Sequence, residues 1–119
     1  MENNVVEITN EDRLLRRAFF ADPQYVREDM TVTSFAFKLR KNEEGLSVDI
    51  EQLTTYEKSI NDANRFRLFA VNAGDVRALG INCQHKPIED NYAHAEIYGT
   101  NVNKKSSQLA KLATYIPFP

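Results

Sequence analysis

The stretch AHAEIYG, residues 93–99, alternates polar and apolar or small side chains with the two-residue period of a β-strand. In an extended chain every second side chain points to the same face, so His94, Glu96 and Tyr98 share one face of this segment. Such alternation is typical of a sheet with one face on the core and the other in solvent. We therefore expect a half-buried sheet that carries a base, an acid and a phenol on its polar face.

Four further segments predict the partners of this strand. Residues 46–51, LSVDIE, repeat the alternation, and we expect them to form a hairpin with residues 32–39, VTSFAFKL, through the polar turn RKNEEG. Residues 65–71, RFRLFAV, are rich in strand-forming residues. Residues 81–88, INCQHKPI, form a short predicted strand that ends at a proline and pairs with residues 93–99.

Helical signals lie between these strands. Thr54 and Glu57 have the spacing of a capping box, which predicts a helix over about residues 55–64. A two-turn helix is expected from Asn72 to the glycine at 80, and a longer one over about residues 103–115.

Residues 13–20, RLLRRAFF, fit a capped helix or a strand, and both alternatives stay open. The interleaved elements predict an α+β fold, with a small mixed or mostly antiparallel sheet and three to four helices. The 119 residues contain no linker, repeat or low-complexity run. We therefore expect a single domain over residues 1–119.

Composition excludes several classes of protein. Hydrophobic residues make up 42% of the chain and charged residues 27%, as in folded globular proteins. Because 15 basic residues face 17 acidic ones, no overall positive field attracts nucleic acid, and binding to nucleic acid is not expected. No apolar run has the length of a membrane span, and the single cysteine, Cys83, cannot form an internal disulfide. These features favour a cytoplasmic protein.

The sequence lacks the spaced motifs of common cofactor and metal sites. The chain has no GxGxxG, GxxxxGK[ST] or GxSxG sequence, so no dinucleotide, P-loop or hydrolase signature is present. His85, His94, Cys83 and Glu96 lack the spacing of zinc ligands. We therefore expect neither a cofactor nor a metal.

The polar face of the predicted sheet is the candidate site. The imidazole of His94 suits a general base, and a serine on the same face suits a donor or nucleophile. Arg16 and Arg17 suit the two-pronged binding of a phosphate or carboxylate. The competing interpretation is an ordinary solvated sheet face, with the arginines paired to Glu11 and Asp12. The face collects Ser34, Lys38, Ser47, Asp49, His94, Glu96 and Tyr98.

The segments DRLLRR, SFAF, LSVD and DNYAHAEIYG occur in this order along most of the chain. In this order they resemble a family of small uncharacterised bacterial proteins that has no settled activity. The resemblance implies a bacterial protein, possible membership of a toxin or defence operon as an accessory component, and importance of the matched polar positions. Those positions are Arg16, Arg17, Ser34, Ser47, Asp49 and His94.

A second resemblance concerns the order of Arg17, Ser34 and Glu96. It is similar to the Arg, Ser, Glu order of ADP-ribosyltransferase-like domains, and it implies an enzyme acting on a nucleotide or another phosphate-bearing substrate. In that hypothesis His94 is the base, Ser34 or Ser47 orients the substrate, and Arg17 neutralises its charge.

The leading hypothesis is a protein that binds a protein partner or a small anionic ligand. The ligand-binding residues would be Arg16, Ser47, Asp49, Glu96 and Tyr98, and a partner surface would include the apolar residues Tyr115, Ile116 and Phe118. The two hypotheses diverge on one geometric point. An enzyme requires that His94, an arginine and a serine meet in one concave pocket.

Overall fold

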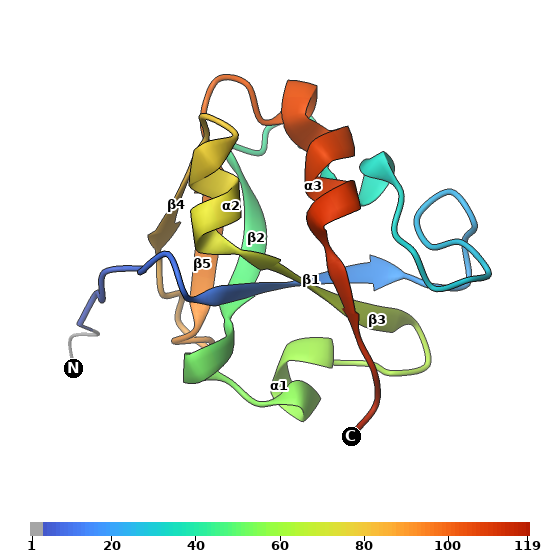
Figure 1. Ribbon diagram of the computed structural model, residues 1–119. Helices are drawn as coiled ribbons and strands as arrows, with labels where there is room; N and C mark the ends of the chain where they lie inside the picture. The colour runs from blue at the N-terminus through green and yellow to red at the C-terminus, as the bar shows by residue number, and fades with distance from the viewer. Residues whose placement is uncertain (1–3) are drawn as a thin grey trace.

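The computed structural model describes residues 4–119, which form a six-stranded sheet in the order β4-β5-β2-β1-β3-β6 (Figure 1). Every pairing between strands is antiparallel. The predicted α+β class is confirmed, and the sheet is larger than predicted. The strands are β1 (Arg13–Phe19), β2 (Gly45–Ile50), β3 (Phe66–Asn72), β4 (Asn82–His85), β5 (His94–Tyr98) and β6 (Thr114–Ile116).

Short helices lie on both faces of the sheet. Residues 4–119 contain three α-helices, α1 (Tyr56–Ile60), α2 (Ala73–Ala78) and α3 (Ser106–Leu112). Three single 3₁₀ turns accompany them, η1 (Ser34–Phe37), η2 (Glu51–Leu53) and η3 (Asn103–Lys105). Helices α2 and α3 cover one face, and α1 lies against the other (Figure 1). None of the described helices is long and apolar enough to cross a bilayer.

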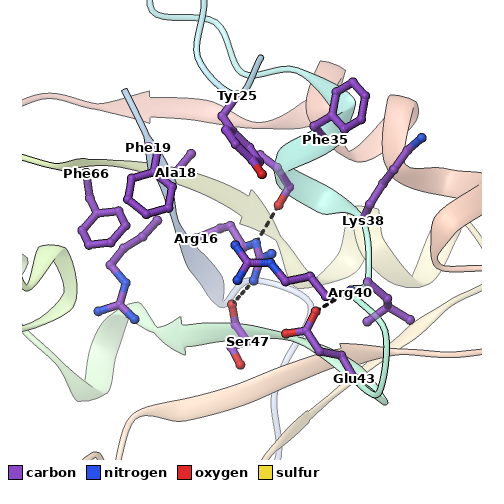
Figure 2. Close-up of a pocket in the computed structure, with 13 residues that line it drawn as sticks. Arg16, Ala18, Phe19, Tyr25, Phe35, Lys38, Arg40, Glu43, Ser47 and Phe66 are labelled. Carbon is purple, nitrogen blue, oxygen red and sulfur yellow. Dashed lines mark hydrogen bonds between the residues drawn. The ribbon is translucent and has the colours of Figure 1, made fainter. Parts of the chain in front are cut away.

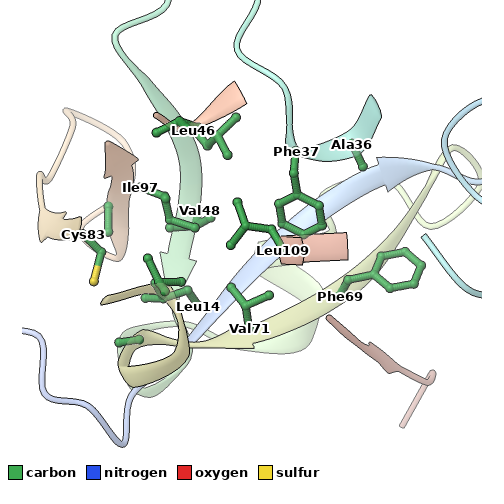
Figure 3. Close-up of a cluster of buried hydrophobic side chains, with 14 of the residues drawn as sticks. Leu14, Ala36, Phe37, Leu46, Val48, Phe69, Val71, Cys83, Ile97 and Leu109 are labelled. Atoms are coloured by element: carbon green, nitrogen blue, oxygen red, sulfur yellow. The ribbon is translucent and has the colours of Figure 1, made fainter. Parts of the chain in front are cut away.

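The main core lies between the sheet and the layer formed by α2, α3 and η1 (Figure 3). Its largest fully buried side chains include Phe37 and Phe69, with Leu109 of α3 packed in the same cluster. A smaller cluster under α1 contains Leu15, Ile60, Leu68 and Ala70. The sheet therefore has buried apolar residues on both faces near β1 and β3.

The second face is only partly covered, because α1 has five residues and packs against β1 and β3. Leu15 of β1 is paired with Asp49 of β2, and Asp49 is paired with His94 of β5. Residues paired across strands share a face, so the apolar patch under α1 continues into a row of polar side chains on β2 and β5. This uncovered part of the sheet carries the candidate site.

The predicted strand over residues 32–39 is wrong, and so is its hairpin with residues 46–51. Residues 34–37 instead form the 3₁₀ turn η1, which packs against α3, while β2 pairs with β1 and β5. Ala36 and Phe37 are adjacent and both buried. A strand would send them to opposite faces, whereas a tight turn directs both toward the core.

Of the ambiguous residues 13–20, Arg13–Phe19 form the strand β1, and Phe20 lies in the turn that follows. Leu14 and Leu15 are both buried on opposite faces of β1, which hides the alternation that marks a strand in the sequence. The expected helix over residues 103–115 ends at Leu112, and the next residues pair with β3 as β6. The expected helix over residues 55–64 stops at Ile60. The predicted pairing of residues 81–88 with 93–99 is confirmed as β4 with β5.

Candidate functional site

Strands β1 and β2 pair at only two positions, Leu14 with Ile50 and Leu15 with Asp49, and the strands then separate. The side chain of Arg16 spans the resulting gap (Figure 2). Its Nε donates to the carbonyl oxygen of Ala36 and its Nη1 to that of Ser47, both at 2.8 Å. Arg16 thus supplies the hydrogen bonds that a neighbouring strand would otherwise supply, and it joins β1, β2 and η1.

A pocket of about 380 Å³ opens at this gap (Figure 2). Its walls come from β1, β2, η1 and the start of β3, and from the loops after β1 and after η1. One carboxylate, that of Glu43, lines it, and this carboxylate already accepts the backbone N–H of Arg40 at 2.6 Å. The basic residues of the wall are Arg16, Arg17, Lys38 and Arg40, and the aromatic ones are Phe19, Tyr25, Phe35 and Phe66.

The positive charge in this pocket is incompletely compensated. Burial lowers the pKa of Arg16 to about 10, the charges of Arg40 and Arg17 act in the same direction, and Glu43 opposes them. The guanidinium stays protonated at neutral pH. Within residues 4–119 none of the four basic side chains forms a salt bridge. A bound anion would therefore be favoured here by electrostatics.

A second cavity, of about 190 Å³, lies on the uncovered sheet face and shares Arg17 and Ser47 with the first. Asp49 lies in its wall and accepts two hydrogen bonds at 2.8 Å, one from Ser59 Oγ and one from Asn91 Nδ2. Both carboxylate oxygens thus have a donor, one from α1 and one from the loop before β5. This network holds Asp49 in place beneath the cavity.

His94 lines the same cavity and lies diagonally opposite Ser47. Its Nδ1 is 2.8 Å from the carbonyl oxygen of Lys86, and its Nε2 is 3.2 Å from Ser47 Oγ. A carbonyl oxygen only accepts, so in the neutral ring Nδ1 carries the proton and donates it. Nε2 is then free to accept the Ser47 hydroxyl proton, as a general base would.

The structure brings most of the candidate residues together. Arg17, Ser47, Asp49 and His94 line one cavity, and Arg16, Arg17 and Ser47 line the adjoining one. These are residues that the sequence pattern assigned to the anion-binding and polar faces.

Glu96 and Tyr98 follow His94 on the same face of β5 but line neither cavity. The Glu96 carboxylate lies 3.4 Å from Lys86 Nζ. A Cβ atom added at Gly45 would lie 2.9 Å from Glu96 Oε1, so the glycine leaves room for this side chain. Glu96 therefore has a packing and ion-pairing role in this structure.

The structure does not bring Ser34 to His94. Ser34 lies in η1 and lines a separate cavity beside α3, together with Arg27 and Lys111. This position follows from the turn at residues 34–37, which replaces the expected strand. Arg17 lines the first two cavities, Ser34 lines this third one, and Glu96 lines none of the three.

Several residues of the two cavities were missed by the sequence pattern. A strand that directs Ser34 and Lys38 to the polar face would direct Phe35 to the core, but the turn leaves Phe35 47% exposed at the pocket. Arg40 lies in the predicted polar turn, and a charged residue in a turn does not show which way its side chain points. Ser59 and Asn91 are brought in by α1 and by a loop, and no local pattern marks them.

Three other predicted features lie apart from these cavities. Cys83 is buried in the main core. No three His, Cys, Asp or Glu side chains within residues 4–119 are grouped as metal ligands. Among the apolar residues near the C-terminus, Phe118 is exposed with its ring 5.2 Å from that of Tyr56, while Tyr115 and Ile116 are half-buried in β6.

Comparison of the chain with protein-family models, with curated proteins and with solved structures found no match. The two resemblances described above therefore stay predictions, and the functional argument rests on the geometry of the cavities.

Proposed function

We propose that this protein binds a small anionic ligand, one that carries a phosphate or a carboxylate, in the pocket between β1 and β2. The observation that supports this proposal most is that four basic side chains and one carboxylate line a single concave pocket. Its volume of about 380 Å³ is that of a small-molecule site. The same walls offer no comparable excess of acidic groups for a cation.

The basic residues have complementary roles. Arg16 is held by two carbonyl oxygens at 2.8 Å, so it is a fixed positive charge at the base of the pocket. Arg17 and Arg40 offer guanidinium groups, which bind phosphate and carboxylate through two parallel hydrogen bonds, and Lys38 adds a mobile charge. Arg17 is weakly held, because its Nη1 lies 3.4 Å from the carbonyl oxygen of Ser59. An anion can therefore meet one preorganised charge, one weakly held charge and two adjustable ones.

The alternative interpretation is that these four basic residues are ordinary solvated charges. The whole chain has a net charge of −2, so the excess of positive charge in the pocket is local and opposite in sign to the charge of the chain. Binding that depends on such charges weakens as salt screens them. The affinity of an anion for this pocket should therefore fall steeply with ionic strength.

Calorimetric titration of the full chain with inorganic pyrophosphate tests the proposal. We expect binding at low salt that weakens by about fivefold or more in Arg17→Ala and in Lys38→Ala, since each removes a charged donor. Lys58→Ala removes an exposed charge on α1 and is the matched control for Lys38→Ala. Absence of binding, or an equal effect of Lys38→Ala and Lys58→Ala, would contradict the proposal.

A second candidate function is favoured by the 3.2 Å contact between His94 Nε2 and Ser47 Oγ. In this hypothesis the protein is an enzyme on a phosphate-bearing substrate, with His94 as general base, Ser47 or a water as nucleophile, and Arg17 neutralising the developing charge. The sequence offered Ser34 or Ser47 as the serine of this hypothesis. Of the two, only Ser47 lies in the cavity of His94 and contacts its imidazole.

Labelling with a fluorophosphonate tests this second function. Ser47 Oγ would form a bond to phosphorus as the P–F bond breaks and fluoride leaves, and the hydroxyl proton would pass to His94 Nε2. We expect a covalent adduct on Ser47 that is absent in His94→Gln. Ser107, an exposed serine of α3, is the internal control. Equal labelling of Ser47 and Ser107 would exclude an activated serine.

A further inference from the structure

We infer that the anionic ligand of this pocket carries a flat aromatic ring beside its phosphate, as a nucleotide does, and that Phe35 is the surface on which the ring stacks. This inference rests on the proposed anion site and adds the chemical class of the ligand. The inference is based on the aromatic residues of the pocket wall, which have no role in binding an anion alone.

Phe35 has an unusual position for a phenylalanine in a core-forming segment. Its neighbour in the same turn, Phe37, is fully buried, whereas Phe35 is 47% exposed. In a 3₁₀ turn residues two apart point in different directions, so burying Phe37 turns Phe35 outward. The turn places this apolar ring at the pocket, near the basic residues, and leaves it in contact with water.

The other aromatic residues of the pocket already have ring partners. Phe19 packs against Tyr25 at 6.1 Å and against Phe66 at 4.8 Å between ring centroids (Figure 2). Phe35 belongs to no aromatic pair among residues 4–119. A ligand ring is the kind of partner that would cover it, because stacking on an aromatic side chain stabilises any nucleobase.

A positive charge lies over the Phe35 ring. Lys38 Nζ lies 5.0 Å from the centroid of Phe35, within the range of a cation–π contact. Lys38 can therefore reach a phosphate that is attached to a ring stacked on Phe35. Figure 2 shows Phe35 and Tyr25 on one side of the Arg16 guanidinium, with Lys38 on the same side as Phe35. The pocket thus places a basic side chain beside an exposed aromatic ring.

Inorganic phosphate, a small carboxylate and a single-stranded nucleic acid fit this pocket less well than a mononucleotide. Inorganic phosphate or a small carboxylate would use the basic side chains and leave Phe35 exposed. A single-stranded nucleic acid needs a basic groove that follows several phosphates, whereas this chain has a net negative charge and its basic residues gather in one pocket of about 380 Å³. A mononucleotide would use the basic side chains and the Phe35 ring at once.

Calorimetric titrations of the full chain with ADP, CDP and pyrophosphate test the inference. We expect each nucleotide to bind about tenfold more tightly than pyrophosphate, since one stacked base adds this much. Phe35→Ala should lower the affinities for ADP and CDP to that for pyrophosphate, because the surface on which the base stacks is lost. Phe35→Tyr should retain the difference. Phe118→Ala removes an equally apolar ring outside the pocket and is the control.

The outcomes separate this inference from the proposed function. Pyrophosphate binding with no gain for ADP or CDP would overturn the inference and leave the anion site intact. Failure of all three ligands to bind would overturn both. Tighter binding of an oligodeoxythymidylate than of either nucleotide would replace the mononucleotide with a single-stranded nucleic acid, and would also overturn the inference. Loss of pyrophosphate binding in Phe35→Ala would show that the ring shapes the pocket instead of stacking on a base.

Discussion

Arg16 Nη1 donates a hydrogen bond of 2.8 Å to the main-chain oxygen of Ser47, across the gap where β1 and β2 stop pairing. The second bond, from Nε to the carbonyl of Ala36, fixes the plane of the guanidinium. A charged side chain thus bridges the gap between β1 and β2, and the pocket opens at the same gap. Stability and ligand binding therefore depend on one residue.

Replacing Arg16 should destabilise the protein clearly. Arg16→Ala removes two charge-assisted hydrogen bonds and leaves two carbonyl oxygens without this donor, which we expect to cost about 2–3 kcal/mol of unfolding free energy. Arg16→Lys should not restore both bonds, because an ammonium lacks the planar fork of the guanidinium. Urea unfolding measures the change. Arg40→Ala, whose side chain has no hydrogen bond within residues 4–119, is the control. Equal stability of the two variants would contradict the bridging role of Arg16.

The Asp49 network should show energetic coupling. Ser59 is 1% exposed and donates to Asp49 Oδ2, so Asp49→Ala leaves a buried hydroxyl without its acceptor. We expect Asp49→Ala to cost about 2 kcal/mol, and to cost about 1 kcal/mol less when Ser59 is already alanine. A double-mutant cycle measured by chemical denaturation gives the coupling. Additive effects would show that the hydrogen bond contributes nothing measurable.

The two histidines should differ in their effect on stability. His85 is buried, and its Nδ1 accepts the N–H of Val6 at 2.9 Å while its Nε2 donates to the carbonyl of Tyr92 at 2.6 Å. We expect His85→Leu to leave both backbone groups unpaired and to cost about 2 kcal/mol. His94→Leu, on the uncovered face, should cost less. Thermal unfolding compares the two, and hydrogen exchange should show loss of protection at the Val6 amide in His85→Leu. Retained protection there would contradict the prediction.

Cys83 should react slowly in the folded protein. Burial raises the pKa of its thiol, although Arg77 acts in the opposite direction. A raised pKa lowers the fraction of thiolate at a given pH, and the thiolate is the reactive form. Labelling with a disulfide reagent at pH 8 should therefore be at least about tenfold slower in the native state than in urea. Equal rates in the two conditions would show that the thiol is accessible.

The polar row on β2 and β5 could be predicted from the sequence because alternation is a local property. In residues 46–51 and 93–99 each apolar side chain is followed by a polar one, and burying the apolar set leaves Ser47, Asp49 and His94 on the opposite face whichever strands are neighbours. The pairing of β2 with β5 then brings these side chains together. The same argument gave a wrong position for Ser34. Its segment also alternates in the sequence, but residues 34–37 form a 3₁₀ turn and not a strand.

What the sequence determined, then, is the mixed class of the fold, the position of most strands and the face on which His94 lies, because each depends on spacing within a few residues. Only the tertiary structure decided that β1 leaves β2 after Leu15, that α1 is too short to cover β2 and β5, and that η1 turns Phe35 toward the basic residues. These features depend on contacts between residues far apart in the chain. The stability of each feature depends on packing in the main core and in the cluster under α1, which a local sequence pattern does not predict.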